Sequence, residues 1–336
     1  MTSLVFQLVA MLFVILAASE LFINALEHLG EKLNISDGVT GSLFAAIGTA
    51  LPETMVPLLA LFAGTADVNI NQEIGVGAIL GAPLMLSTLS TCLMALSVLR
   101  QRGVTGRIRP EHSGFARDLN FFLLAFSFAA VAMAVPIEAR YTRSAISIAL
   151  VLTYFIYIIL TLRASKQLVE DGHGTEAENK MFLARIGFPT NLLTILLQFG
   201  MGLALLVFGA KGFISGVEGV AQSLGISTLL LSLLIIPIAT ELPEKVNSVL
   251  WVRRGKDTLA FGNITGAMVF QGTLLPAIGI MLTPWQPRIE VLTGVLVTLI
   301  AAAWLRLNMR PRGLQIWMLL VNGALYVTYL FITLTR

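Results

Sequence analysis

The segment SDGVTGSLFAAIGTALPE, from Ser36 to Glu53, returns in altered form as STLLLSLLIIPIATELPE, from Ser227 to Glu244. When each residue is aligned with the one 191 positions later, the two stretches keep a gap-free register over more than 30 residues. Both end in Leu-Pro-Glu, which places Glu53 and Glu244 at corresponding points of two apolar segments. Ionisable groups at membrane depth are costly and therefore indicate function. Two of them on duplicated segments predict a shared site where two halves of the chain meet.

The composition identifies the surroundings of the chain as a lipid bilayer. Of the 336 residues, 56% are hydrophobic and 12% are charged, against roughly 25% charged in an average soluble domain. We therefore expect a multi-pass membrane protein. Its basic loops are explained without a nucleic-acid partner. The single cysteine, Cys92, excludes both a disulfide framework and a cysteine–histidine metal site. The apolar run 4–25 lacks a basic leader and a small-residue cleavage pattern, so we interpret it as a retained first helix.

Ten apolar runs are long enough to cross a bilayer core of roughly 30 Å. The predicted fold is therefore all-α, with ten transmembrane helices in two sets of five. The longest polar stretch separates the two sets and is predicted to be a solvated cytoplasmic linker, 163–189. The predicted spans lie near residues 4–26, 38–63, 74–99, 119–136, 144–162, 190–213, 227–252, 258–283, 289–305 and 314–334.

The basic residues predict the orientation of these spans. Most of the 22 lysines and arginines fall in loops on one predicted side of the membrane, and basic loops favour the cytoplasm. Both termini are then non-cytoplasmic in the cell (inner) membrane. Five spans per half is an odd number, so the repeats 1–162 and 190–336 must have opposite orientations. Inverted repeats are typical of secondary transporters that bind their substrate near the midplane. The basic residues predicted on the other side are Arg140, Arg143, Lys211, Arg288 and Arg336.

Oxygen atoms suited to a hard cation surround the two glutamates. Pro52 and Pro243 lack a backbone N–H, so they free carbonyl oxygens near Thr49/Glu53 and Thr240/Glu244. A glycine-rich segment follows in each half, and its small-xxx-small spacing lets helix backbones approach closely. The aligned glycines are Gly77 and Gly81 in the first half and Gly262 and Gly266 in the second.

These motifs resemble those of the calcium/cation antiporter superfamily, the sodium/calcium exchanger-like membrane proteins. That family carries two inverted repeats, each with a G-T-S-x-P-E helix followed by a G-N-x-x-G-S-N-x-x-N/D helix. The corresponding segments here are GTALPE (48–53), ATELPE (239–244), GAILGAPLML (77–86) and GNITGAMVFQ (262–271). The resemblance implies that Glu53 and Glu244 coordinate the transported cation. Threonine hydroxyls and carbonyls before the proline would join them, which points to Thr49, Thr240, Ala46 and the carbonyls near Ile47 and Ile238.

Several positions depart from the family pattern. The serines after the second-motif glycine are replaced by Ala82 and Ala267. The asparagine or aspartate one turn later is Leu86 in the first half and Gln271 in the second. Gln271 is therefore a candidate ligand, although a packing hydrogen bond is an equal alternative for it. Calcium takes 6–8 oxygens, a number that this set approaches less closely than the family pattern does.

The span 227–252 has gained charge. Glu241 replaces the first-motif serine and is a further candidate ligand, and Lys245 lies four residues after it, a spacing that favours pairing on a helix. Lys245 would then act as a built-in cation and favour proton or monovalent exchange over calcium. The alternatives are a buried structural ion pair and a position near the cytoplasmic exit.

The leading functional interpretation is a secondary active antiporter, not an enzyme. It would exchange Ca²⁺ or a related cation for Na⁺ or H⁺ by alternating access, with Glu53 and Glu244 at the midplane. No nucleotide-binding glycine loop is visible, so we expect no cofactor, with inorganic cations as substrates. The alternative is a degenerate exchanger-fold protein that acts as a non-transporting sensor or partner subunit. For the glutamates themselves the alternative is an interhelical polar contact. The sequence does not indicate an oligomeric state.

Overall fold

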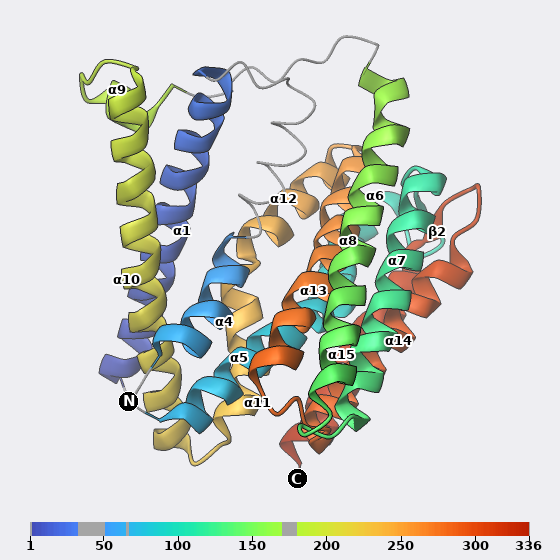
Figure 1. Cartoon of the computed structure of the whole chain (residues 1–336). Helices are drawn as coiled ribbons and strands as arrows, with labels where there is room; N and C mark the ends of the chain where they lie inside the picture. The colour runs from blue at the N-terminus through green and yellow to red at the C-terminus, as the bar shows by residue number, and fades with distance from the viewer. Residues whose placement is uncertain (1, 33–50, 65–66, 170–179, 336) are drawn as a thin grey trace. The chain divides into compact units, whose positions relative to one another are not determined.

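The computed structural model describes residues 2–32, 51–64, 67–169 and 180–335, and nearly all of them are helical (Figure 1). Within these residues, eight helices are long and apolar enough to cross a membrane. The apolar stretches are Ser3–Phe22, Val68–Arg102, His112–Ala134, Arg140–Thr161, Leu192–Leu224, Ala260–Leu282, Ile289–Asn308 and Ile316–Leu334. They coincide with eight of the ten spans predicted from the sequence.

The secondary structure follows the apolar runs, with short breaks at polar or proline-containing positions. The helices are α1 (Thr2–Lys32), α4 (Leu51–Ala63), α5 (Val68–Met85), the π-helical turn η2 (Leu86–Ser90), α6 (Thr91–Arg102), α7 (His112–Val131), the 3₁₀ turn η3 (Ala132–Ala134), α8 (Arg140–Val169), α9 (Phe182–Arg185), α10 (Leu192–Leu224), α11 (Thr228–Thr240), α12 (Leu242–Arg253), α13 (Asp257–Leu282), α14 (Ile289–Asn308) and α15 (Ile316–Leu334). Two short antiparallel strands, β1 (Arg107–Ile108) and β2 (Leu314–Gln315), tie two loops together.

The two predicted spans that carry the Leu-Pro-Glu motifs contain shorter helices. In the first of them the described helix is α4, and the residues before Leu51 lie outside the described part of the chain. The second is divided between α11 and α12, which meet at Glu241. The segment 227–252, predicted as one continuous span, is therefore divided into two shorter helices.

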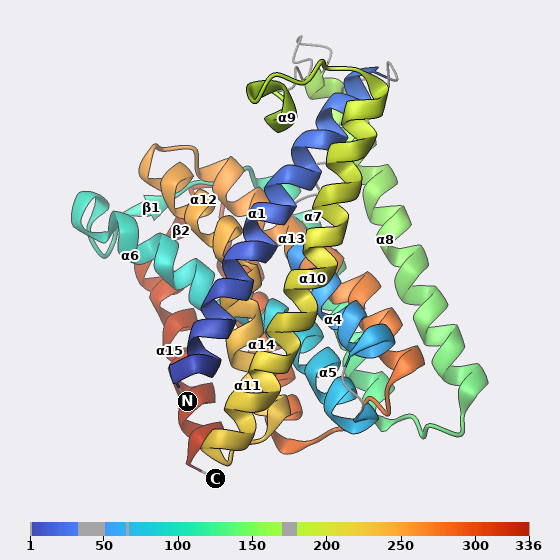
Figure 2. The same cartoon turned by 90° about the vertical axis from the view of Figure 1, so that its left-hand side faces the viewer.

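The chain forms two compact units, and each unit takes segments from both halves of the sequence. The first contains residues 1–71 and 159–226, and the second contains residues 72–158 and 227–336. In the first unit, α1 and α10 lie side by side (Figures 1 and 2).

Glycines on α10 allow this close packing. A side chain added at Gly202 would meet Phe22, whereas one added at Gly216 would meet Leu8. Since the contact moves toward the beginning of α1 as α10 proceeds, the two helices are antiparallel. Small residues permit such backbone approach inside a membrane. The side-chain amide of Gln7 adds a hydrogen bond of 2.9 Å to the carbonyl of Gly212.

The predicted linker 163–189 is partly structured. Helix α8 continues through its first residues to Val169, and α9 lies in its last part. Met181 and Leu183 are buried against Ile195 of α10, and the backbone N–H of Leu183 donates to the side chain of Gln198. The expectation that the whole stretch is solvated is therefore wrong for these residues, because two apolar side chains give them a surface on which to pack.

In the second unit, polar contacts fasten both ends of α13. The guanidinium of Arg102 pairs with both carboxylate oxygens of Asp257, at 2.9 and 3.0 Å. At the other end of α13, buried Arg143 donates to the carbonyls of Ile280, Thr283 and Pro284. The contacts of Arg143 thus satisfy carbonyl oxygens that the C-terminal end of a helix leaves without helical partners.

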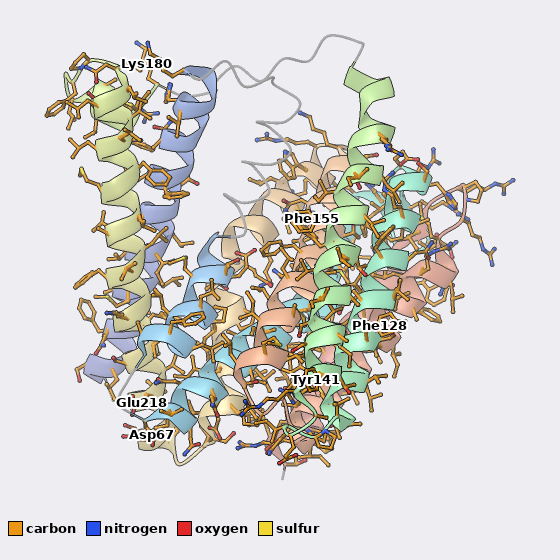
Figure 3. All side chains as sticks on the ribbon, in the orientation of Figure 1. Asp67, Phe128, Tyr141, Phe155, Lys180 and Glu218 are labelled. Atoms are coloured by element: carbon orange, nitrogen blue, oxygen red, sulfur yellow. The ribbon has the colours of Figure 1, made fainter. Side chains whose placement is uncertain are left out.

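Large apolar side chains cover the outer faces of the second unit. Phe128 on α7, together with Tyr141 and Phe155 on α8, is exposed (Figure 3). Exposure of these side chains to water would be unfavourable, whereas lipid tails solvate them well. The apolar helices and their exposed apolar faces identify an integral, multi-pass membrane protein.

Candidate functional site

The helix break at Glu241 is the structural centre of the second motif. Helix α11 ends at Thr240, Glu241 adopts φ −92° and ψ 9°, and α12 begins at the next residue. Proline explains the position of the break, because Pro243 lies in the first turn of α12, where its missing N–H is tolerated. Because Pro243 has no backbone N–H, a carbonyl in the preceding turn of α11 has no helical hydrogen-bond donor.

Lys245 reaches back across this break. Its ammonium nitrogen lies 3.0 Å from Oε2 of Glu241 and donates a 2.8 Å hydrogen bond to the carbonyl oxygen of Pro237. Glu241 is fully buried and Lys245 is 5% exposed. The pairing predicted from the four-residue spacing is therefore confirmed.

Helix termini favour both charges of this pair. Glu241 occupies the N-cap position of α12 without a capping hydrogen bond from its side chain, at the helix end where partial positive charge accumulates. The Lys245 ammonium contacts a carbonyl in the last turn of α11, where partial negative charge accumulates. Since removal of two charges from water costs several kcal/mol per ion, these additional contacts are needed to hold the pair inside the protein.

Two other predicted ligands lie in the same unit. Gln271 on α13 is fully buried, and its side chain lies close to the Glu241 carboxylate. Thr240 is also buried, and its hydroxyl donates to the carbonyl of Ile236 at 3.0 Å. A hydroxyl that donates its proton in this way retains lone pairs for a cation. The structure thus brings Glu241, Gln271 and Lys245 together beside the break.

The remaining predicted ligands are described less completely. Glu53 lies in the first turn of α4 and is 3% exposed, so its carboxylate is buried as expected. It belongs to the first unit, whereas Glu241 and Gln271 belong to the second. Glu244 lies in α12, but its side chain is outside the described set, and Thr49 precedes the described part of α4. Among described residues, no three His, Cys, Asp or Glu side chains gather as a metal site.

The glycines of the first half pack against the helix that bears the break. A side chain at Gly77 would meet Leu229 and Ser232, and one at Gly81 would meet the Leu233 carbonyl and the ring of Pro237. The helical donor for the Leu233 carbonyl would be residue 237, which is a proline. Helix α5 therefore approaches α11 where the α11 backbone is not internally bonded.

The aligned glycines of the second half behave differently. Among the described residues, no atom comes within 4 Å of a side chain built at Gly262, and only the Tyr157 hydroxyl approaches Gly266. The expected close packing is thus confirmed for Gly77 and Gly81 and is not observed for Gly262 in the described part of the chain. The asymmetry extends to the ends of the motifs, because Leu86 begins the π-helical turn η2, whereas Gln271 continues α13.

One buried carboxylate escaped the sequence prediction. Asp118 on α7 is 6% exposed and accepts hydrogen bonds from Tyr157 (3.0 Å) and Thr265 (2.6 Å). The predicted span 119–136 leaves Asp118 in the preceding loop, whereas α7 begins at His112. The buried positions Phe115, Asp118, Leu119 and Phe122 carry a helical period that would have revealed it.

Comparison with known proteins agrees with these features. The profile of the family described as sodium/calcium exchanger protein matches residues 3–163 and 194–335. The chain belongs to this family. Its members are secondary cation transporters rather than enzymes, and they belong to the calcium/cation antiporter superfamily that the motifs resemble.

The chain is also similar to individual exchangers and antiporters. The chain is 26% identical over 286 residues to the putative antiporter CaxA of Alkalimonas amylolytica, which covers 83% of this chain and 81% of CaxA. Its fold is similar to that of the H⁺/Ca²⁺ exchanger CAX, with a TM-score of 0.65, 20% identity and coverage of 99% and 88%. It is also similar to the sodium-calcium exchanger NCX_Mj, with a TM-score of 0.57, 22% identity and coverage of 98% and 99%.

Proposed function

We propose that this exchanger-family protein is a secondary antiporter that exchanges Ca²⁺ or a related cation for Na⁺ or H⁺. The carboxylates of Glu53 and Glu244 bind the transported cation near the midplane of the inner membrane. The observation that carries this proposal is the pair of Leu-Pro-Glu motifs, at 51–53 and 242–244, in a chain that the exchanger profile matches on both sides of the linker. An ion gradient supplies the energy, so no cofactor is required.

The proposed topology is ten spans in two inverted repeats, 1–162 and 190–336, with both termini non-cytoplasmic. The antiparallel packing of α1 on α10 supports it, because these are the first helices of the two repeats. Corresponding helices of inverted repeats run in opposite directions. The profile match in two blocks, 3–163 and 194–335, has the same division.

The proposed ligands are oxygens of the two motif helices and of α13. Glu53 and Glu244 supply charge, Thr49 and Thr240 supply hydroxyls, and Gln271 supplies an amide oxygen. The burial of Glu53, Thr240 and Gln271 supports this set, since water does not saturate their oxygens. Hard cations such as Ca²⁺ and Na⁺ prefer oxygen ligands of these kinds. Glu241 adds a carboxylate to the same region, already paired with Lys245.

The names of the relatives support the choice of ions. CAX is an H⁺/Ca²⁺ exchanger and NCX_Mj is a sodium-calcium exchanger. The antiporter proposed here therefore binds Ca²⁺ or a similar cation in exchange for one of the two counter-ions. Ala82, Ala267 and Leu86 replace oxygen-bearing residues of the family motif, so the affinity for Ca²⁺ is expected to be lower than that of a site with the complete motif.

Ion flux into proteoliposomes tests the proposal. Purified protein is reconstituted, and uptake of Ca²⁺ is measured under imposed Na⁺, K⁺ and pH gradients. Gradient-driven uptake should disappear in Glu53→Gln and Glu244→Gln. Glu218→Gln is the matched control, because Glu218 lies near the end of α10, aligns with Glu27 in the 191-residue repeat and should tolerate the change. Uptake that survives both site substitutions would remove the proposed site. A parent protein without any gradient-driven flux would instead favour the non-transporting alternative.

A further inference from the structure

The groups around the Lys245 ammonium are those that would hold a metal cation. The ammonium nitrogen contacts a carboxylate oxygen of Glu241 at 3.0 Å and the carbonyl oxygen of Pro237 at 2.8 Å. The Gln271 side chain lies close to the Glu241 carboxylate. A carboxylate, a backbone carbonyl from a broken helix and an amide are the oxygen ligands by which transporters coordinate Na⁺.

Burial makes this arrangement more than a surface ion pair. Glu241 is fully buried and Lys245 is 5% exposed, so neither charge is compensated by bulk water. An unpaired buried carboxylate is strongly unfavourable, so it either takes up a proton or is accompanied by a cation. In this chain the cation is covalently attached to α12, one helical turn after Glu241.

We propose that the Lys245 ammonium is a fixed internal cation that permanently fills a monovalent-cation subsite formed by Glu241 and the Pro237 carbonyl. The protein consequently binds one fewer cation from solution than the same site would without the lysine. The proposal concerns which cation occupies a subsite beside the transport site. Only its consequence for transport rests on the proposed function.

Removal of the lysine should open the subsite to Na⁺. The Lys245→Gln variant keeps a polar side chain of similar length but leaves Glu241 without a positive partner. A ligand that binds only the folded state stabilises it. Thermal unfolding of Lys245→Gln in detergent should therefore shift upward by about 5 °C when Na⁺ replaces N-methylglucamine at constant ionic strength. Equilibrium binding of radioactive Na⁺ should show one additional ion per protein relative to the parent.

Two matched variants assign the effect to Glu241. The double variant Glu241→Gln/Lys245→Gln has no buried charge to compensate, so it should fold without the Na⁺-dependent shift and without the additional ion. Lys211→Gln removes an exposed lysine of α10 and should behave like the parent.

Several results would overturn the inference. One is a Lys245→Gln protein whose stability and Na⁺ binding match those of the parent. Another is an equal Na⁺ effect in the double variant, which would exclude Glu241 as the ligand. A third is Lys245→Gln that remains unfolded at every Na⁺ concentration while the double variant folds, because the pair would then be structural only. None of these readouts uses flux, so they are separate from a failure of the antiport proposal, which Glu53→Gln and Glu244→Gln reveal.

Discussion

Thr265 on α13 donates a 2.6 Å hydrogen bond to the carboxylate of Asp118 on α7, inside the apolar core of the second unit. The Tyr157 hydroxyl on α8 donates to the other oxygen of the same carboxylate. One buried acidic group thus connects three helices, and both of its oxygens are engaged. A hydrogen bond to a charged group contributes about 1.5–3 kcal/mol, so this junction should matter for the stability of the unit.

Replacement of Asp118 by alanine should destabilise the protein by about 1–3 kcal/mol, because two buried hydroxyls would lose their acceptor. The measurement is thermal or denaturant unfolding in detergent. Asp118→Asn retains an acceptor for one hydroxyl and should lose less stability. If Asp118→Ala and Thr265→Val were additive in a double-mutant cycle, the two side chains would not be coupled and the prediction would fail.

Gly81→Ala should impair folding or transport, because its methyl group would press on the backbone carbonyl of Leu233. Overpacking of a tight contact costs typically 1–3 kcal/mol, and here the obstructing atom belongs to a helix backbone that cannot rotate aside. The readouts are the unfolding temperature and the initial rate of uptake. Gly200→Ala is the control, since no atom of the described residues lies within 4 Å of the added carbon. Equal behaviour of the two variants would show that α5 does not need this close approach.

Thr240→Val should raise the cation concentration for half-maximal uptake about tenfold, which corresponds to roughly 1.4 kcal/mol of lost coordination. Thr240→Ser retains the hydroxyl and should stay near the parent value. Thr298→Val is a suitable control, because the Thr298 hydroxyl is also buried and also donates to a carbonyl one turn earlier on its own helix. A normal half-saturation constant in Thr240→Val would remove Thr240 from the ligand set.

The proposed orientation predicts which end of α10 faces the cytoplasm. Figure 3 shows Lys180 and Glu218 at opposite ends of the α1–α10 pair. In a Cys92→Ala background, Lys180→Cys should react with an impermeant maleimide only from the cytoplasmic side, and Glu218→Cys only from the other side. Intact cells and inverted vesicles give the two readings. Reaction of both positions from the same side would contradict the predicted topology.

Much of the fold could be predicted from the sequence because membrane spans are long and uniformly apolar. Eight predicted spans coincide with long helices, and the Glu241–Lys245 pair follows from four-residue spacing alone. The end of α11 at Thr240 was harder to locate, since prolines at 237 and 243 both interrupt the backbone ladder. A span boundary placed at 119 from hydropathy leaves out Asp118, because the turn before it is amphipathic rather than uniformly apolar.

Contacts between distant segments could not be predicted from residue types. The aligned pairs Gly77/Gly81 and Gly262/Gly266 look equivalent in the sequence, yet only the first pair is pressed against a neighbouring helix in the described structure. What decides this is the identity of the neighbour, which depends on the three-dimensional arrangement. The division into two units has the same origin, because it follows from which helices pack together rather than from the order in which they occur.

That division has a consequence for how the protein is assembled. The first unit pairs α1 with α10, and the second combines α5 to α7 with α11 to α15, so each unit draws helices from both sides of the linker. Neither half of the chain therefore contains a complete folding unit. During synthesis α1 enters the bilayer before its partner α10 exists, because α10 begins at Leu192, beyond the middle of the chain. Each half of the chain therefore supplies part of the surface against which the other half folds.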